Sequence, residues 1–282
     1  MFSGSFSAII GESFTRSTAS TPSFAFSDSV SKNPPENLVC FCPAPKNFPS
    51  RSEGKQKPSY NINMLRKFPN NLRKEFAVFK KLNTPAKIQD FVNALPFNFE
   101  HGGDTYWSPL EVLRRGTAHC MEGAMLAAAA LWYHGARPLL IDLRVTKQKS
   151  VKDVDHAVAP FTFRGRWGAV SKTNHGVLRY RESVYRDPRE LAMSYFHEYF
   201  LNDGRKTLRE YSAPFDLSRY GDTWLTGADV SDVVIALDDA RHYPVASPAI
   251  VKTFRRADPV ERETGKIVEW KKGKSLIFND NP

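Results

Sequence analysis

The sequence predicts an α+β domain in which an N-terminal helical part packs against an antiparallel sheet. The first observation is residues 120–133, a stretch that is apolar nearly all round and carries Glu122 as its one charge, which is typical of a buried helix. The second is residues 138–145, a mostly apolar run that predicts a buried strand. The third is the alternating stretch 155–163, which a turn at 164–166 joins to a further strand.

Residues ahead of the buried helix carry start and stop signals. Ser108, Pro109 and Glu111 form a capping-box pattern with proline at the first helical position, which predicts a short helix from Pro109 to Arg115. Gly116 ends it, and the chain then restarts at Cys120. The cysteine therefore lies in the first turn of a core helix.

Cys120 has two interpretations. The first turn of a helix has unpaired N–H groups and the positive end of the dipole, which favour a thiolate. The alternative is a small buried hydrophobic residue, which is what most lone intracellular cysteines are. A histidine on the next predicted strand favours the first interpretation, and His156 is the one histidine of 155–163.

A cysteine at a helix start, a strand, and then a histidine on the following strand resemble the transglutaminase-like superfamily. The match covers about Trp107 to Tyr180. The matching residues are Pro109-Leu110-Glu111-Val112-Leu113, Gly116, Cys120, Gly135-Ala136-Arg137-Pro138, His156 and Gly165-Arg166-Trp167-Gly168. The resemblance implies a papain-like, transglutaminase-like core with the cysteine on a buried helix and the histidine on the sheet.

The resemblance also implies a mechanism. Cys120 would attack a carboxamide or ester as a thiolate, and His156 would pair with it as an imidazolium and then protonate the leaving amine. Family members commonly have an aspartate where this chain has Ser171, and Asn174 is a second candidate to orient the histidine ring. Asp187 is assigned instead to capping a helix that starts at Pro188.

Three further residues are candidates for substrate binding. His119 precedes the cysteine and could touch the site or occupy a loop, and Tyr106 and Trp107 could wall a groove or pack in the core. The remaining histidines show no metal-ligand spacing, so neither a metal site nor a cofactor is expected.

The flanks of the predicted domain differ from it in composition. Residues 1–63 are rich in serine, threonine and proline and are expected to be a disordered leader, upstream of a true start at Met64. The domain is expected over 64–251, beginning with a basic amphipathic helix and a second helix opened by Thr84 and Pro85. Residues 252–282 are expected to be a charged tail.

Two short strand predictions concern the C-terminal part. The apolar run Val233–Leu237 predicts a last strand of the domain. Residues Ile267 to Trp270 and Ser275 to Phe278 are expected to form one short strand pair within the tail.

Composition limits the function classes. The formal net charge is +10, but lysine and arginine are spread along the chain without a nucleic-acid-binding pattern, so nucleic acid is an unlikely partner. No apolar run is long enough for a membrane span. Three widely split cysteines, including Cys40 and Cys42, favour a reducing compartment, so the protein is expected to be cytoplasmic.

Two functions are therefore expected from the sequence. The first is cysteine-dependent acyl chemistry, by hydrolysis or acyl transfer, on a peptide or protein substrate. The second is a catalytically degenerate domain of the same fold that binds a polypeptide. Oligomeric state is not readable from the sequence.

Overall fold

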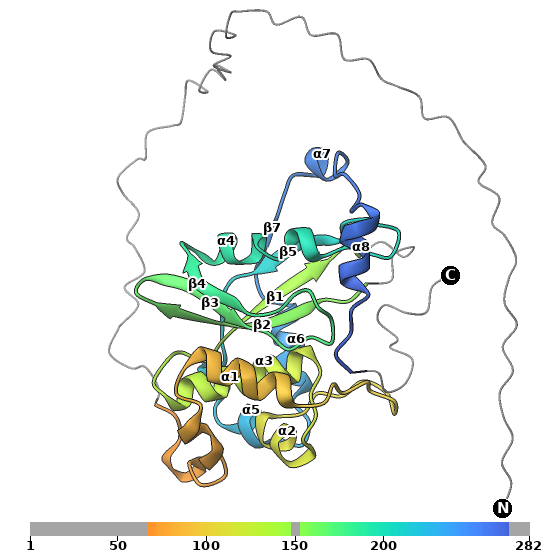
Figure 1. The fold of residues 1–282 in the computed structure, drawn as a ribbon. Helices are drawn as coiled ribbons and strands as arrows, with labels where there is room; N and C mark the ends of the chain where they lie inside the picture. The colour runs from red at the N-terminus through yellow and green to blue at the C-terminus, as the bar shows by residue number, and fades with distance from the viewer. Residues whose placement is uncertain (1–66, 148–152, 271–282) are drawn as a thin grey trace, which may run out of the picture. The chain divides into compact units, whose positions relative to one another are not determined.

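The computed structural model describes residues 67–147 and 153–270. Within this part of the chain, one seven-stranded antiparallel sheet has the order β4-β3-β2-β1-β5-β7, with β6 also paired to β1 (Figure 1). The strands are β1 Leu139–Val145, β2 His156–Phe163, β3 Arg166–Val170, β4 Arg181–Tyr185, β5 Leu208–Ser212, β6 Phe215–Asp216 and β7 His242–Pro244. The predicted hairpin is confirmed as β2 and β3, which turn at Arg164 and Gly165.

Helices cover both faces of this sheet. Figure 1 shows α1, α2, α3 and α5 on one face and α4 and α8 on the other. The α-helices are α1 Pro85–Ala94, α2 Pro109–Arg115, α3 Cys120–Tyr133, α4 Pro188–Met193, α5 Thr223–Thr226, α6 Ser231–Asp238, α7 Pro248–Val251 and α8 Pro259–Gly265. Short 3-10 turns occupy Asn70–Leu72, Ala77–Lys81, Phe196–Glu198 and Leu217–Tyr220. The predicted bounds of α2 and α3 are confirmed.

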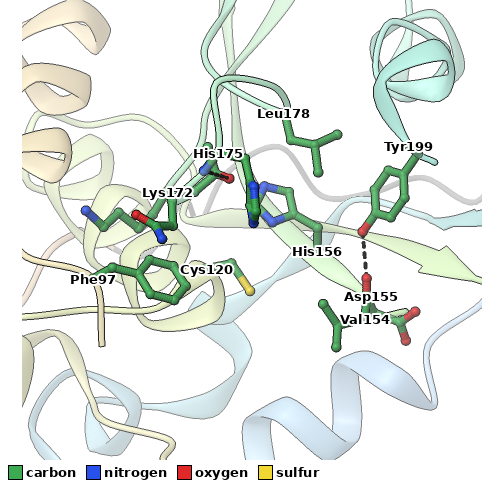
Figure 2. A pocket seen from close by; sticks show the side chains of 11 residues that line it. Phe97, Cys120, Val154, Asp155, His156, Lys172, His175, Leu178 and Tyr199 are labelled. Atoms are coloured by element: carbon green, nitrogen blue, oxygen red, sulfur yellow. Dashed lines mark hydrogen bonds between the residues drawn. The ribbon is translucent and has the colours of Figure 1, made fainter. Parts of the chain in front are cut away.

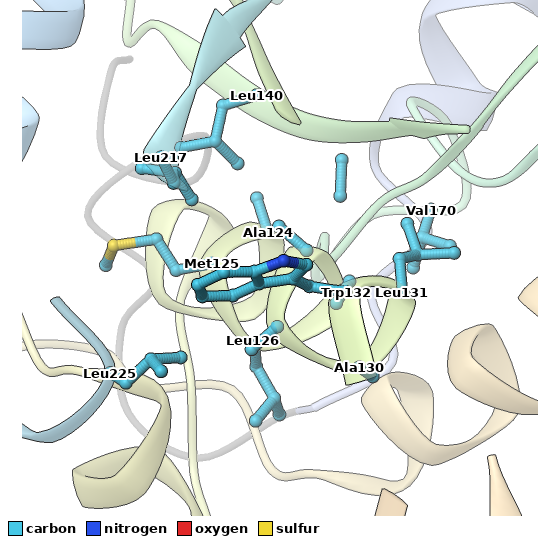
Figure 3. Packing of buried hydrophobic residues seen from close by; sticks show 14 of the residues in the cluster. Ala124, Met125, Leu126, Ala130, Leu131, Trp132, Leu140, Val170, Leu217 and Leu225 are labelled. Atoms are coloured by element: carbon cyan, nitrogen blue, oxygen red, sulfur yellow. The ribbon is translucent and has the colours of Figure 1, made fainter. Parts of the chain in front are cut away.

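The core sits on both faces because the central strands alternate. In β1, Leu140 packs toward the α3 face and Ile141 toward the α4 face. Every residue of α3 from Glu122 to Tyr133 is buried, and the alanines in its middle let the sheet and neighbouring elements approach closely (Figure 3). The start of α3 is therefore fixed by packing along the whole helix.

Two helix and strand predictions are wrong. The run Val233–Leu237 lies in α6, where Val233 and Leu237 are buried one turn apart and Ile235 is 61% exposed. A short apolar run fits a strand and a helix equally well, so the sequence of this run does not distinguish them. In the structure Val233 and Leu237 are buried four residues apart, which is the pattern of a helix. The basic amphipathic helix is also absent from residues 67–81, where Pro69 interrupts the pattern and two 3-10 turns replace it.

The segment after α8 packs along the loop that follows β3. His175 and Val268 form an isolated antiparallel bridge, and Gly176 donates its N–H to the Ile267 carbonyl. The predicted partner strand 275–278 lies outside the described residues, as do the predicted leader, Cys40 and Cys42. The domain boundaries at 63/64 and 251/252 stay predictions.

The described helices are all shorter than a membrane span. The longest α-helix among the described residues, α3, has 14 residues, and a span needs about 20. None of the described helices has the length and apolarity to cross a membrane.

Candidate active site

Cys120 is the first residue of α3 and is only partly buried. His119 caps the helix by accepting the Met121 N–H on Nδ1 at 3.3 Å, and Glu122 returns a carboxylate oxygen to the His119 N–H at 3.0 Å. This reciprocal capping box fixes the first turn. The cysteine sulfur is thereby held at the positive end of a buried helix.

Cys120 and His156 line one cavity (Figure 2). Its volume is about 30 Å³, room for roughly one or two water molecules. The lining residues are Phe97, Cys120, Val154, Asp155, His156, Lys172, Thr173, Asn174, His175, Leu178 and Tyr199. His156 reaches this cavity as the first residue of β2, so helix start and strand start converge there.

Ser171 holds the His156 ring. The Ser171 hydroxyl lies 2.8 Å from His156 Nε2 and donates to the Leu178 carbonyl at 2.5 Å. The hydroxyl has one hydrogen and donates it to the Leu178 carbonyl. Its oxygen therefore accepts the hydrogen bond from His156, so Nε2 carries a proton. In the neutral ring, Nδ1 is then the nitrogen with a free lone pair.

Gln89 holds Ser171 in turn, and the sequence analysis did not identify it. Its amide oxygen accepts the Ser171 N–H at 2.9 Å, and its amide nitrogen donates to the Ser171 carbonyl at 2.8 Å. Gln89 is 6% exposed on α1, 82 positions before Ser171. The signal in the sequence was the position of Gln89 on the apolar face of the helix, beside Ile88 and three residues before Val92.

Asn174 is not a ring partner in this structure. Its side-chain oxygen accepts the Trp270 N–H at 2.8 Å, and its side-chain nitrogen donates to the Trp270 carbonyl at 3.3 Å. The Asn174 amide therefore fastens the C-terminal segment beside the cavity, and of the two candidates Ser171 makes the contact with His156.

A second histidine approaches the thiol from its own helix start. His119 Nδ1 lies 4.0 Å from Cys120 Sγ, while Nε2 lies 2.8 Å from the Thr105 carbonyl. Glu122, fully buried, has an oxygen 3.4 Å from the same Nε2. His119, a candidate for substrate binding from the sequence, does not line the cavity.

These contacts shift the titration of the site. Burial raises the pKa of the Cys120 thiol, but hydrogen bonds from His119 and His156 outweigh burial and lower it to about 6. Burial lowers the pKa of His119, yet hydrogen bonds with Cys120 and Glu122 raise it well above its usual range. At neutral pH the favoured form of Cys120 is the thiolate.

The two aromatic candidates lie apart from the cavity. Tyr106 lines a neighbouring cavity of about 340 Å³ between Met121 and α6. Trp107 is half-buried, donates its backbone N–H to Glu122 at 3.3 Å, and stacks under the Arg115 guanidinium at 4.4 Å. Their roles in substrate binding stay predictions.

An acidic group lines part of that neighbouring cavity, and sequence spacing did not reveal it. Carboxylate oxygens of Asp142, Asp155 and Asp238 lie within 4.8 Å of one another. Arg144 pairs with Asp238 at 2.6 Å, and His242 pairs with Asp142 at 3.0 Å, so protein cations already offset part of the charge. Burial and the nearby Asp142 charge raise the pKa of Asp155 to about 6.

Comparison with solved structures finds several likenesses, and the two described below are weak. No protein-family profile and no curated protein sequence matches the chain. LapG of Legionella pneumophila is 18% identical over 37% of this chain and 66% of that one, with a TM-score of 0.27. EGTA-treated LapG of the same organism is 14% identical over 56% of this chain and 90% of that one, with a TM-score of 0.32. Similarity this low carries no argument about chemistry.

Proposed function

We propose that the protein carries out cysteine-dependent acyl chemistry on amide bonds of peptides or proteins, with Cys120 as nucleophile. The observation that supports this most directly is the meeting of Cys120 and His156 in one cavity, with the histidine ring held by Ser171. A nucleophile, a base and a group that orients the base are what such catalysis requires.

The geometry suits a papain-type sequence of steps. The thiol proton moves to an imidazole, and the sulfur electron pair attacks the carbonyl carbon of the substrate. The C–N bond breaks, the imidazolium of His156 returns the proton to the leaving amine, and a thioester on Cys120 remains. Water or a second amine then attacks the thioester and releases the acyl group.

One observation favours a second function, a groove that binds a polypeptide without turning it over. Ser171 offers His156 a neutral oxygen, which orients an imidazole but does not compensate the charge of an imidazolium. On this alternative Cys120 would be a contact residue and its replacement by alanine would leave polypeptide affinity nearly unchanged.

Thiol reactivity tests the nucleophile first. The native full chain is labelled with iodoacetamide from pH 5 to 9, and peptide mass spectrometry follows Cys120 against Cys40 and Cys42. We expect half-maximal labelling of Cys120 near pH 6 and of the other two near the ordinary thiol range of about 8.5. A labelling midpoint of Cys120 in the ordinary thiol range would contradict the proposal.

Turnover separates the two functions. The wild type and Cys120→Ala are incubated with glutamine, peptide and aryl-ester acyl donors, with and without an amine acceptor. The enzyme predicts product that the alanine variant does not form. A low-pH thiolate with no turnover by the wild type on any donor would favour the binding function.

A further inference from the structure

We propose that His119 and Glu122 form a second acid–base couple on Cys120, in which the buried Glu122 carboxylate supplies the negative charge that Ser171 does not supply to His156. This inference rests on the proposed function, since it concerns the same thiolate. It makes His119 a catalytic residue, because it touches the reacting sulfur, and Glu122 a positioning residue.

The first argument is the charge of Glu122. Its side chain is fully buried, and His119 is its only ion-pair partner among the residues that the structure describes. The other contacts of the carboxylate are neutral donors, namely Thr105 Oγ1 at 2.8 Å, Trp107 N at 3.3 Å, His119 N at 3.0 Å and Asn98 Nδ2 at 3.2 Å. A buried carboxylate without a cation is costly, so this site favours the imidazolium form of His119.

The second argument is the orientation of the ring. Nε2 of His119 lies 2.8 Å from the Thr105 carbonyl, which can only accept, so Nε2 carries a proton. Nδ1 is then the nitrogen that faces the sulfur, at 4.0 Å. The ring is held from behind by Glu122, and the one lone pair of Nδ1, which accepts the Met121 N–H, is the site that can take the thiol proton.

The proton step balances within these residues. The Sγ–H bond of Cys120 breaks, its electron pair stays on sulfur, and a new N–H bond forms at Nδ1 of His119. The Met121 N–H gives up its acceptor in this step, because Nδ1 can no longer accept. The product is a thiolate beside an imidazolium whose charge Glu122 stabilises.

All but one of the charged groups around this couple favour a positive charge on His119. Glu122 and, on the preceding loop, Glu100 at 3.6 Å from Nε2 favour the cation on His119, as does the Cys120 thiolate. His156 lines the same cavity as Cys120, and an imidazolium there opposes a second positive charge on His119. His119 therefore holds the thiol proton in the resting pair, and the proton must pass to His156 before His156 can protonate the leaving amine.

Two matched variants test the couple in the full chain. Glu122→Gln keeps the shape and one of the two acceptor oxygens but removes the charge. His119→Asn keeps an N-cap oxygen for the Met121 N–H but removes the titrating ring. Glu182→Gln, on an exposed carboxylate, is the control. The readout is the pH profile of iodoacetamide labelling at Cys120, which a purely structural capping role would leave unmoved.

We expect both variants to raise the labelling midpoint by about one pH unit, so that labelling at pH 6 falls about fivefold, while the control keeps the wild-type midpoint. Unchanged midpoints in variants that still fold would overturn the couple and leave Cys120 as nucleophile. An ordinary midpoint in the wild type would overturn the proposed function as well. If Glu122→Gln does not fold, the profile of His119→Asn alone decides.

Discussion

His119 lies 4.0 Å from the Cys120 sulfur and His156 shares a cavity with it, and the two rings have differently built surroundings. Behind His119 stands a buried carboxylate with four neutral donors, all drawn from the start of α3 and the loop before α2. Behind His156 stands the hydroxyl of a serine whose backbone is held by a glutamine on α1. A hydroxyl fixes a ring in position, whereas a carboxylate also changes the energy of its charged form. Orientation and charge compensation are thus divided between two histidines.

Removing the carboxylate should have the largest effect on stability. Glu122→Ala leaves the donors of Thr105, Trp107 and His119 without their acceptor in the interior. We expect the free energy of unfolding to fall by about 3–5 kcal/mol, as for other broken buried charge networks. Urea unfolding measures this, with the exposed Glu75→Ala as control. A loss below about 1 kcal/mol would mean that Glu122 is not the centre of that network.

The second-largest loss of stability is expected at Gly123, where the surroundings of His119 and of His156 meet. A Cβ on Gly123 would lie 2.3 Å from Lys172 Cβ, next to both Glu122 and Ser171. Gly123→Ala should therefore cost about 2–3 kcal/mol by overpacking, despite the better helix propensity of alanine. Thermal unfolding tests it against Gly102→Ala, whose Cβ meets nothing within 4 Å. Equal melting temperatures of the two variants would contradict the close approach.

Removing the support of Ser171 should cost less stability. Gln89→Ala removes both hydrogen bonds to the Ser171 backbone, and we expect the free energy of unfolding to drop by about 1–2 kcal/mol. The midpoint of Cys120 labelling should stay closer to that of the wild type than in Glu122→Gln, because only orientation is affected. The exposed neighbour Asp90→Ala is the control. A larger midpoint shift for Gln89→Ala would reverse the roles assigned to the two sides.

The smallest effect concerns the residue before His156. Because burial, and then Asp142, raise the pKa of Asp155 to about 6, its contribution to stability is complete below about pH 4 and is lost as the pH rises through 6. Asp155→Asn should be more stable than the wild type at pH 8, by less than about 1 kcal/mol, because only part of the residue is shielded from solvent and the exposed part is screened. The difference should vanish at pH 4. Urea unfolding at both pH values measures it, and a gain at pH 4 alone would contradict the sign.

Local signals in the sequence were enough for the helices and strands that carry Cys120 and His156. Proline at the first helical position of α2, glycine after it, and the apolar stretch of α3 fixed those helices, because each signal acts within a few residues. The hairpin of β2 and β3 followed from alternation and a turn. The run Val233–Leu237, wrongly predicted as a strand, had no such signal beside it to distinguish a helix from a strand.

The partners of the site residues were harder to predict, because they come from distant parts of the chain. Gln89 meets Ser171 across 82 positions, and Asn174 meets Trp270 across 96. Nothing near Asn174 in the sequence indicates that its amide is already used. Glu122 was visible as the lone charge of a buried helix, and its burial beside His119 follows only from the folded structure.

The burial of α3 on all sides also has a consequence for amide hydrogen exchange. Its backbone N–H groups are bonded within the helix and covered by both the sheet and the neighbouring helices, so no local opening of modest cost exposes them. Amides from the second turn of α3 onward should exchange only when the whole domain unfolds. The cysteine then lies at the start of the slowest-exchanging helix of the described residues, and loss of its reactivity on heating should coincide with global melting.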